Sequence, residues 1–170
     1  EGAFPLSENF TESAGQPPLG PTTAVTLHNW IRIRNSQPPG TLQAWFIPNP
    51  VPPFPAQDGG AQTYAAANFE DVAGNNTISS WLISPVLPLA VGNTISFYTR
   101  TIGPVNFPDR LELAISGSGN STNVGATPTS VGVFTRNPLT INPTLTLSGY
   151  PTVWTHFSYT LTPIDIGSGT

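Results

Sequence analysis

The chain has 170 residues, of which only 8% are charged, and its formal net charge of −4 includes five cations, all arginine. This charge balance excludes an electrostatic surface for nucleic acid or for an anionic membrane. The chain contains no cysteine, which excludes disulfides and thiol chemistry, and no apolar run approaches the roughly 20 residues of a membrane-spanning helix.

The size and composition predict one all-β domain. A chain of this length can bury a real core, so we expect a single domain over residues 1–170, with residues 1–5 as an extended lead-in. Twenty prolines and sixteen glycines would suit disorder, but 38% of the residues are hydrophobic, which favours a folded protein with many turns. The chain lacks methionine even at its first position. Removal of a signal peptide is the simplest explanation, and we expect a bacterial-type secreted protein, extracellular or on the cell surface.

Alternation of apolar and polar side chains predicts the first strands. Residues 26–35 alternate with a period of two, as a half-buried strand does. Ile31 and Ile33 would lie on one face of this strand, and Arg32 and Arg34 on the other. Shorter strands are predicted at residues 6–11, 45–47 and 64–69, and a stiff proline-rich loop is predicted at residues 48–60.

The rest of the chain is expected to pack around two apolar runs, residues 81–83 and 93–101. Pro85 ends the first run because proline cannot donate a hydrogen bond to a strand ladder. The second run follows a Gly-Asn turn signal, and it alternates so that Ile95 and Phe97 share one face.

The C-terminal half predicts further strands of the same kind. Residues 110–116 would place Leu111, Leu113 and Ile115 inward, and residues 154–162 would place Phe157, Tyr159 and Leu161 on one face. Short strands are also predicted at residues 134–141 and 145–147. No stretch longer than about two turns has a helical period, so no helix is predicted. A sheet with one buried face and no helices needs a second sheet to cover it, which predicts an antiparallel β-sandwich.

The chemistry-bearing residues do not form an enzyme motif. His28 and His156 are far apart and have no neighbouring carboxylate or cysteine to complete a zinc site. No G-x-S-x-G sequence marks a nucleophilic serine. Asp109 and Glu112 have no identifiable partner for a glycosidase pair. We therefore expect a protein that is not an enzyme.

Two ligand sites are predicted. Carboxylate and amide oxygens in loops suit calcium, and Asn68, Glu70 and Asp71 offer them after the strand at residues 64–69. Aromatic rings can stack on sugars, and four of them gather around the proline-rich loop: Trp45, Phe46, Phe54 and Tyr64. The alternative for these aromatics is that they fill the core or hold the loop in place.

Several segments together resemble the choice-of-anchor J domain, a group related to the cleaved-adhesin domains of bacterial surface proteases. The resemblance is carried by WLISPVLPLAVGNTISFYTRT at residues 81–101, by FPDRLELAIS, by STNVG and TSVG, by GYPTVWTHFSYTL, and by the earlier AWF and FPAQDGGAQTYAAANF. It implies a jelly-roll-like sandwich on secreted or surface-anchored proteins, with adhesive rather than catalytic members. Some relatives carry structural calcium, and Glu8 stands where they have an acidic residue in the first strand.

The chain ends at Thr170, whereas members of that group continue with further strands. Three readings follow. The chain is part of a longer protein, or another copy supplies the missing strands and builds a fibre, with residues 2–6 as a donor, or the core closes differently. The sequence therefore favours a non-catalytic, extracellular structural or adhesive module that self-assembles by strand complementation. The alternative is a carbohydrate-binding module of a secreted protein.

Overall fold

A computed structural model describes residues 8, 10, 25–27, 30–42, 45–46, 54–59 and 63–166. The predicted lead-in at residues 1–5, the donor segment at residues 2–6 and His28 lie outside these residues. So does the strand predicted at residues 6–11, except for Glu8 and Phe10.

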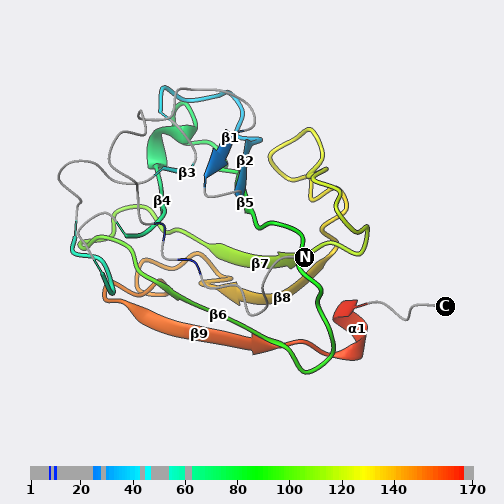
Figure 1. The fold of residues 1–170 in the computed structure, drawn as a ribbon. Helices are drawn as coiled ribbons and strands as arrows, with labels where there is room; N and C mark the ends of the chain where they lie inside the picture. The colour runs from blue at the N-terminus through cyan, green and yellow to red at the C-terminus, as the bar shows by residue number, and fades with distance from the viewer. Residues whose placement is uncertain are drawn as a thin grey trace. The chain divides into compact units, whose positions relative to one another are not determined.

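The chain forms two compact units, one made of Glu1–Leu87 with Thr122–Gly132 and the other of Pro88–Ser121 with Val133–Thr170. Each unit is built from short antiparallel strands with almost no helix, as Figure 1 shows. The predicted all-β class is therefore confirmed. The sheets themselves are small, and the single domain stays a prediction.

The first unit holds a three-stranded sheet in the order β1-β2-β5 and a two-stranded sheet of β3 and β4. These strands are β1 (Val25–Leu27), β2 (Trp30–Arg34), β3 (Trp45–Phe46), β4 (Ala66–Ala67) and β5 (Ser80–Ile83). A short 3-10 helix, η1 (Phe69–Asp71), follows β4, and the Asn68 side chain caps it by accepting a hydrogen bond from the Glu70 amide.

The single strand predicted at residues 26–35 is wrong, because this segment is a hairpin. Leu27 pairs with Trp30, so β1 folds back on β2 through only two residues. Arg32 lies on the face of β2 opposite Ile31 and Ile33 and is buried there, with only 5% of its surface exposed. Its guanidinium donates to the Trp45 carbonyl of β3, which gives the buried cation an acceptor. Burial lowers the pKa of Arg32.

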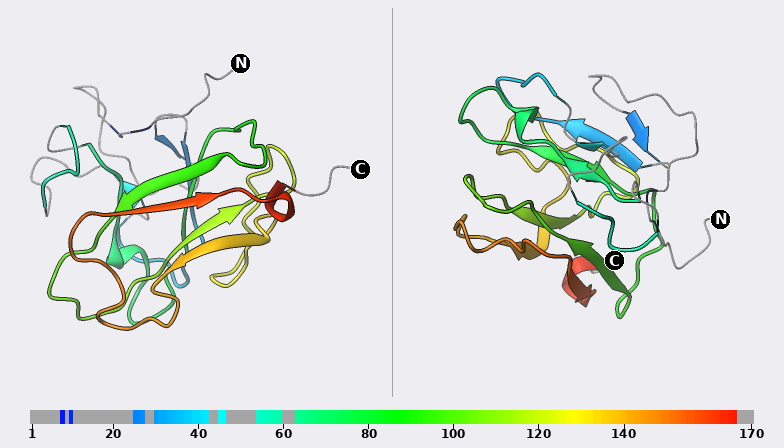
Figure 2. Two further views of the ribbon diagram at one scale, coloured as in Figure 1. Left: turned by 90° about the horizontal axis from the view of Figure 1, so that it is seen from below. Right: turned by 90° about the vertical axis from the view of Figure 1, so that its left-hand side faces the viewer.

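The second unit holds two antiparallel ribbons, β6–β9 and β7–β8. Their strands are β6 (Thr94–Thr99), β7 (Leu111–Ile115), β8 (Arg136–Ile141) and β9 (Thr155–Thr160). The views in Figure 1 and Figure 2 show the two ribbons running beside each other. A single helical turn, α1 (Pro163–Ile166), follows β9 and was not predicted.

The predicted alternation of β6 and β9 is confirmed. Ile95 and Phe97 are less exposed than their neighbours in β6, and Phe157 is less exposed than its neighbours in β9. The rings of Phe97 and Phe157 face each other across the ribbon with centroids 6.1 Å apart, which is the cross-strand pairing that stabilises a sheet.

The strand predicted at residues 145–147 is wrong, because this segment forms turns. The buried Asn142 side chain donates to the Thr146 carbonyl at 2.9 Å and accepts from the Thr146 amide at 2.9 Å. These bonds hold Asn142 and Leu145 at positive φ, a conformation that strands do not adopt.

Candidate functional site

The four predicted sugar-stacking aromatics lie in the first unit and have contacts of their own. Tyr64 is only 6% exposed, stacks on Phe54 at 5.2 Å and donates its hydroxyl to the Phe54 carbonyl at 3.2 Å. Trp45 in β3 donates its indole N–H to the Ser80 carbonyl at 3.1 Å. Phe46 pairs with Ala66 in the same small sheet. Tyr64 therefore holds the loop at Phe54 and has little surface left for a ligand.

The three predicted calcium ligands are each bound within the chain. The Asn68 side chain caps η1, and Glu8 accepts from the Phe10 amide at 2.6 Å. Among the described residues, no group of three or more His, Cys, Asp and Glu could hold a metal ion. The calcium site at Glu8, Asn68 and Asp71 stays a prediction.

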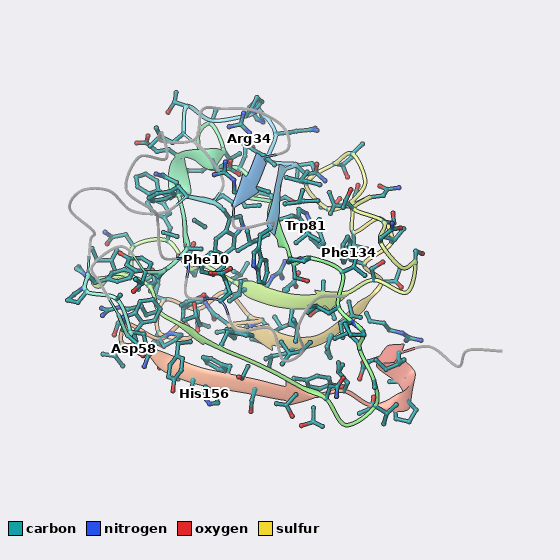
Figure 3. All side chains as sticks on the ribbon, in the orientation of Figure 1. Phe10, Arg34, Asp58, Trp81, Phe134 and His156 are labelled. Carbon is teal, nitrogen blue, oxygen red and sulfur yellow. The ribbon has the colours of Figure 1, made fainter. Side chains whose placement is uncertain are left out.

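Asp71 is fully buried at the centre of a polar network that the sequence did not reveal. One carboxylate oxygen accepts from the Ser36 hydroxyl at 2.5 Å and from the Ser80 hydroxyl at 2.7 Å. The other lies 3.7 Å from Nε of Arg34, which is labelled in Figure 3. The network links β2, β5 and η1. The oxygen that faces Arg34 has no hydrogen-bond donor among the described residues, so the two serine hydroxyls and the nearby guanidinium are what offset the burial of this charge.

The outer face of the β6–β9 ribbon carries the clearest set of exposed side chains. Cross-strand pairing brings its members together as Thr94–Thr160, Ser96–Ser158 and Tyr98–His156. All six are exposed, and Figure 3 shows His156 on β9. The Tyr98 and His156 rings lie 4.9 Å apart, and the two threonine hydroxyls are 3.1 Å apart. The face contains no Asp, Glu, Lys or Arg.

The long edges of this ribbon carry backbone groups that point away from it. Within the described residues, β6 and β9 pair only with each other. The Leu161 amide donates to the Asn93 carbonyl at 2.8 Å, so these two residues form a hydrogen-bonded pair just before β6 and after β9. Hydrogen-bonded and non-hydrogen-bonded pairs alternate along an antiparallel ladder, which makes Ser96 and Ser158 a non-hydrogen-bonded pair. The N–H and C=O groups of Ser96 therefore point away from β9. Those of Ser158 point away from β6.

The β7–β8 ribbon differs because it carries features that discourage pairing at a sheet edge. Glu112 lies within β7 and forms an ion pair with Arg110 at 3.2 Å. Arg136 and Pro138 lie within β8, and the register of the ribbon shifts between Leu113 and Ile115. Charges, proline and bulges are how sheet proteins protect their edges. Neither β6 nor β9 contains an Asp, Glu, Lys, Arg, Pro or Gly.

A polar cluster lies at one end of the β6–β9 ribbon. The Tyr150 hydroxyl lies 2.7 Å from the Thr99 hydroxyl. Burial raises the pKa of Tyr150, and the negative charge of Asp109 adds to this increase, while the Thr99 hydrogen bond opposes it. Burial also raises the pKa of Asp109, against a hydrogen bond from Thr101. The phenol is therefore neutral at ordinary pH and acts as a hydrogen-bonding group.

Asp165 of α1 anchors the chain after β9. Its carboxylate accepts from the Thr162 amide at 2.8 Å, from the Thr162 hydroxyl at 2.6 Å and from the Tyr159 hydroxyl at 2.8 Å. These bonds, with those from Thr162 the largest effect, lower the pKa of Asp165, and the charge of Arg136 acts in the same direction. The first turn after the ribbon is thus held by an ionised carboxylate.

Comparison with known protein families, with curated proteins and with solved structures finds no match. The resemblance to the choice-of-anchor J domain therefore stays a prediction. In the part of the chain that the structure describes, no helix has the length and hydrophobicity needed to cross a membrane.

Proposed function

We propose that the chain is a non-catalytic structural or adhesive module of an extracellular or cell-surface protein, and that copies of it associate edge to edge through the β6–β9 ribbon. The proposed architecture is a jelly-roll-like sandwich whose sheets are extended by strands from neighbouring copies. Low charge, the lack of cysteine and the abundance of turn residues support a secreted module.

The observation that carries the proposal is the contrast between the two ribbons. An edge strand offers unpaired N–H and C=O groups to any other strand, and proteins usually protect it. The β7–β8 ribbon has an internal charge, a proline and a register shift. The six-residue strands β6 and β9 have none of these in the described structure. The edges of β6–β9 are therefore suited to strand addition.

The contacts within the described residues also support a structural role. The buried carboxylates of Asp71 and Asp165 each accept hydrogen bonds from hydroxyl donors of their own unit, through one oxygen in each case. Each holds a 3-10 turn or a helical turn against a strand. These groups act as fold-stabilising anchors.

The experiment measures self-association with proline placed at one edge. Ser96→Pro removes an outward N–H from β6 without removing an inward side chain, because position 96 is exposed and alternates with Ile95 and Phe97. Ser96→Ala is the matched control, since it removes the hydroxyl but keeps the N–H. Sedimentation velocity over a concentration series should show association of the original chain and of Ser96→Ala, and a monomer for Ser96→Pro.

A second edge variant, Ser158→Pro, identifies the kind of contact. If β6 of one copy pairs with β9 of the next, either proline abolishes association and the original chain forms open filaments. If β6 pairs with β6, only Ser96→Pro has an effect. Ser96→Lys is a third variant, which places a charge beside the edge and leaves the backbone donors in place. A purely monomeric original chain would contradict the proposal. So would association that Ser96→Pro, Ser158→Pro and Ser96→Lys all leave unchanged in folded protein.

A further inference from the structure

We propose that the outer face of the β6–β9 ribbon is a binding site for neutral polysaccharides. The site is the set of six exposed residues defined above, which we call the ribbon face: Thr94, Ser96, Tyr98, His156, Ser158 and Thr160. It is complete in one copy of the chain, so the inference does not depend on edge-to-edge association.

The residue types on the ribbon face match the chemistry of a sugar chain. Hydroxyl groups of serine and threonine both donate and accept hydrogen bonds, as sugar hydroxyls do. Two of the three cross-strand pairs consist only of such residues, and the Thr94 and Thr160 hydroxyls lie 3.1 Å apart. The ribbon face therefore presents paired donor and acceptor groups along both strands.

The third pair supplies apolar surface for the C–H faces of a sugar ring. Tyr98 is 47% exposed, and its ring lies 4.9 Å from that of His156 at an interplanar angle of 51°. Aromatic rings combine a large apolar surface with little conformational entropy to lose. Because neighbouring strands lie about 4.8 Å apart and alternate residues about 6.8 Å apart, the rings and hydroxyls form a continuous strip.

Charge complementarity selects a neutral polysaccharide. The ribbon face has no carboxylate, arginine or lysine, so it would give a charged polymer no permanent counter-charge. The nearest cation along β6 is Arg100, whose Nε hydrogen donates to the Thr101 carbonyl at 3.4 Å. A protein partner would also fit poorly, because serine is depleted at protein interfaces and Tyr98 is the only residue of the ribbon face among the types enriched at their buried centre.

The test is affinity electrophoresis of the full chain in native gels that contain a neutral polysaccharide, with mixed-linkage glucan, galactomannan and hydroxyethyl cellulose as separate probes. Gels with alginate or pectin provide the anionic comparison. We expect at least one neutral polymer to retard the chain and the anionic polymers to have no effect. Tyr98→Ala should weaken binding about tenfold, by analogy with other aromatic stacking sites.

Two further variants keep the test specific. Phe107→Ala removes another highly exposed aromatic, 72% exposed, from a loop outside the ribbon face and should bind as the original chain does. Tyr98→Phe keeps the ring and should retain binding within about threefold. No retardation by any neutral polymer, retardation by anionic polymers instead, or equal losses in Tyr98→Ala and Phe107→Ala would overturn the proposal. Because sedimentation reports the edges and electrophoresis reports the ribbon face, either idea can fail alone.

Discussion

Replacing Asp71 with alanine should destabilise the first unit by about 3 kcal/mol. The substitution removes two hydrogen bonds from the Ser36 and Ser80 hydroxyls to a fully buried carboxylate, each contributing about 1.5–3 kcal/mol when the acceptor is charged. It also leaves Arg34 without the carboxylate 3.7 Å from its Nε. Removal of one partner from a buried pair costs about 3–5 kcal/mol. The lower end applies because the Arg34 side chain is 24% exposed and water can hydrate it.

Urea unfolding followed by tryptophan fluorescence measures this change. Three of the four tryptophans, Trp30, Trp45 and Trp81, lie in the first unit, and Trp154 lies in the second, so most of the emission reports the part of the chain that holds Asp71. Asp71→Asn keeps the shape and one acceptor oxygen and should lose about half as much stability. Asp58→Asn is the control, because Asp58 is exposed and its carboxylate bonds only to the adjacent Gly59 amide in the described structure. Its effect should stay within about 0.5 kcal/mol.

A loss below about 1 kcal/mol for Asp71→Ala would refute this reasoning. It would mean that the two serines find other partners or water, and that the carboxylate does not organise β2, β5 and η1. Equal losses for Asp71→Asn and Asp71→Ala would show that negative charge, rather than the hydroxyl network, is responsible for the stability.

Two further predictions concern local structure. Gly40→Ala should lower the free energy of unfolding in urea by about 3 kcal/mol, because a Cβ at this position would lie 1.9 Å from the Glu70 carbonyl oxygen. Gly117→Ala is the control and should change the free energy of unfolding little, because the space around Gly117 is open. Asp165 has a lowered folded pKa, chiefly through the hydrogen bonds from Thr162, so its contribution to stability is present above about pH 4 and is lost as the pH falls through the folded pKa. The unfolding midpoint measured from pH 5 to pH 2 should therefore fall more steeply in the original chain than in Asp165→Asn. Parallel curves for the two proteins would show that the ionised Asp165 carboxylate does not stabilise the fold.

The strands β6 and β9 were predictable because local signals agree along each of them, whereas their pairing with each other was not predicted. Residues alternate with a period of two, and Gly92 at φ +87° supplies the turn before β6. The β1–β2 hairpin was not predictable in this way, since His28 and Asn29 between the paired Leu27 and Trp30 lack the glycine that usually marks a two-residue turn.

The site residues of the first unit depend on contacts that no local pattern encodes. Asp71 meets Ser80 nine residues away and Ser36 at a separation of 35 residues. Alternation places Arg32 and Arg34 on one face of their strand, but it does not show that Arg32 is buried and donates to the Trp45 carbonyl of β3. Periodicity predicts the face of a strand, but a second element determines whether that face meets water.

The connection between β7 and β8 has a consequence for handling the protein in pieces. Residues 122–132 belong to the first unit although strands of the second precede and follow them. Their carbonyls accept from the side chains of Asn35 and Gln37, at 3.1 Å for Gly125 and 3.0 Å for Ala126. A fragment that stops at Leu87 would lack these acceptors, and one that starts at Pro88 would carry a segment without its binding site. Neither unit can therefore be excised intact by a single cut in the gene.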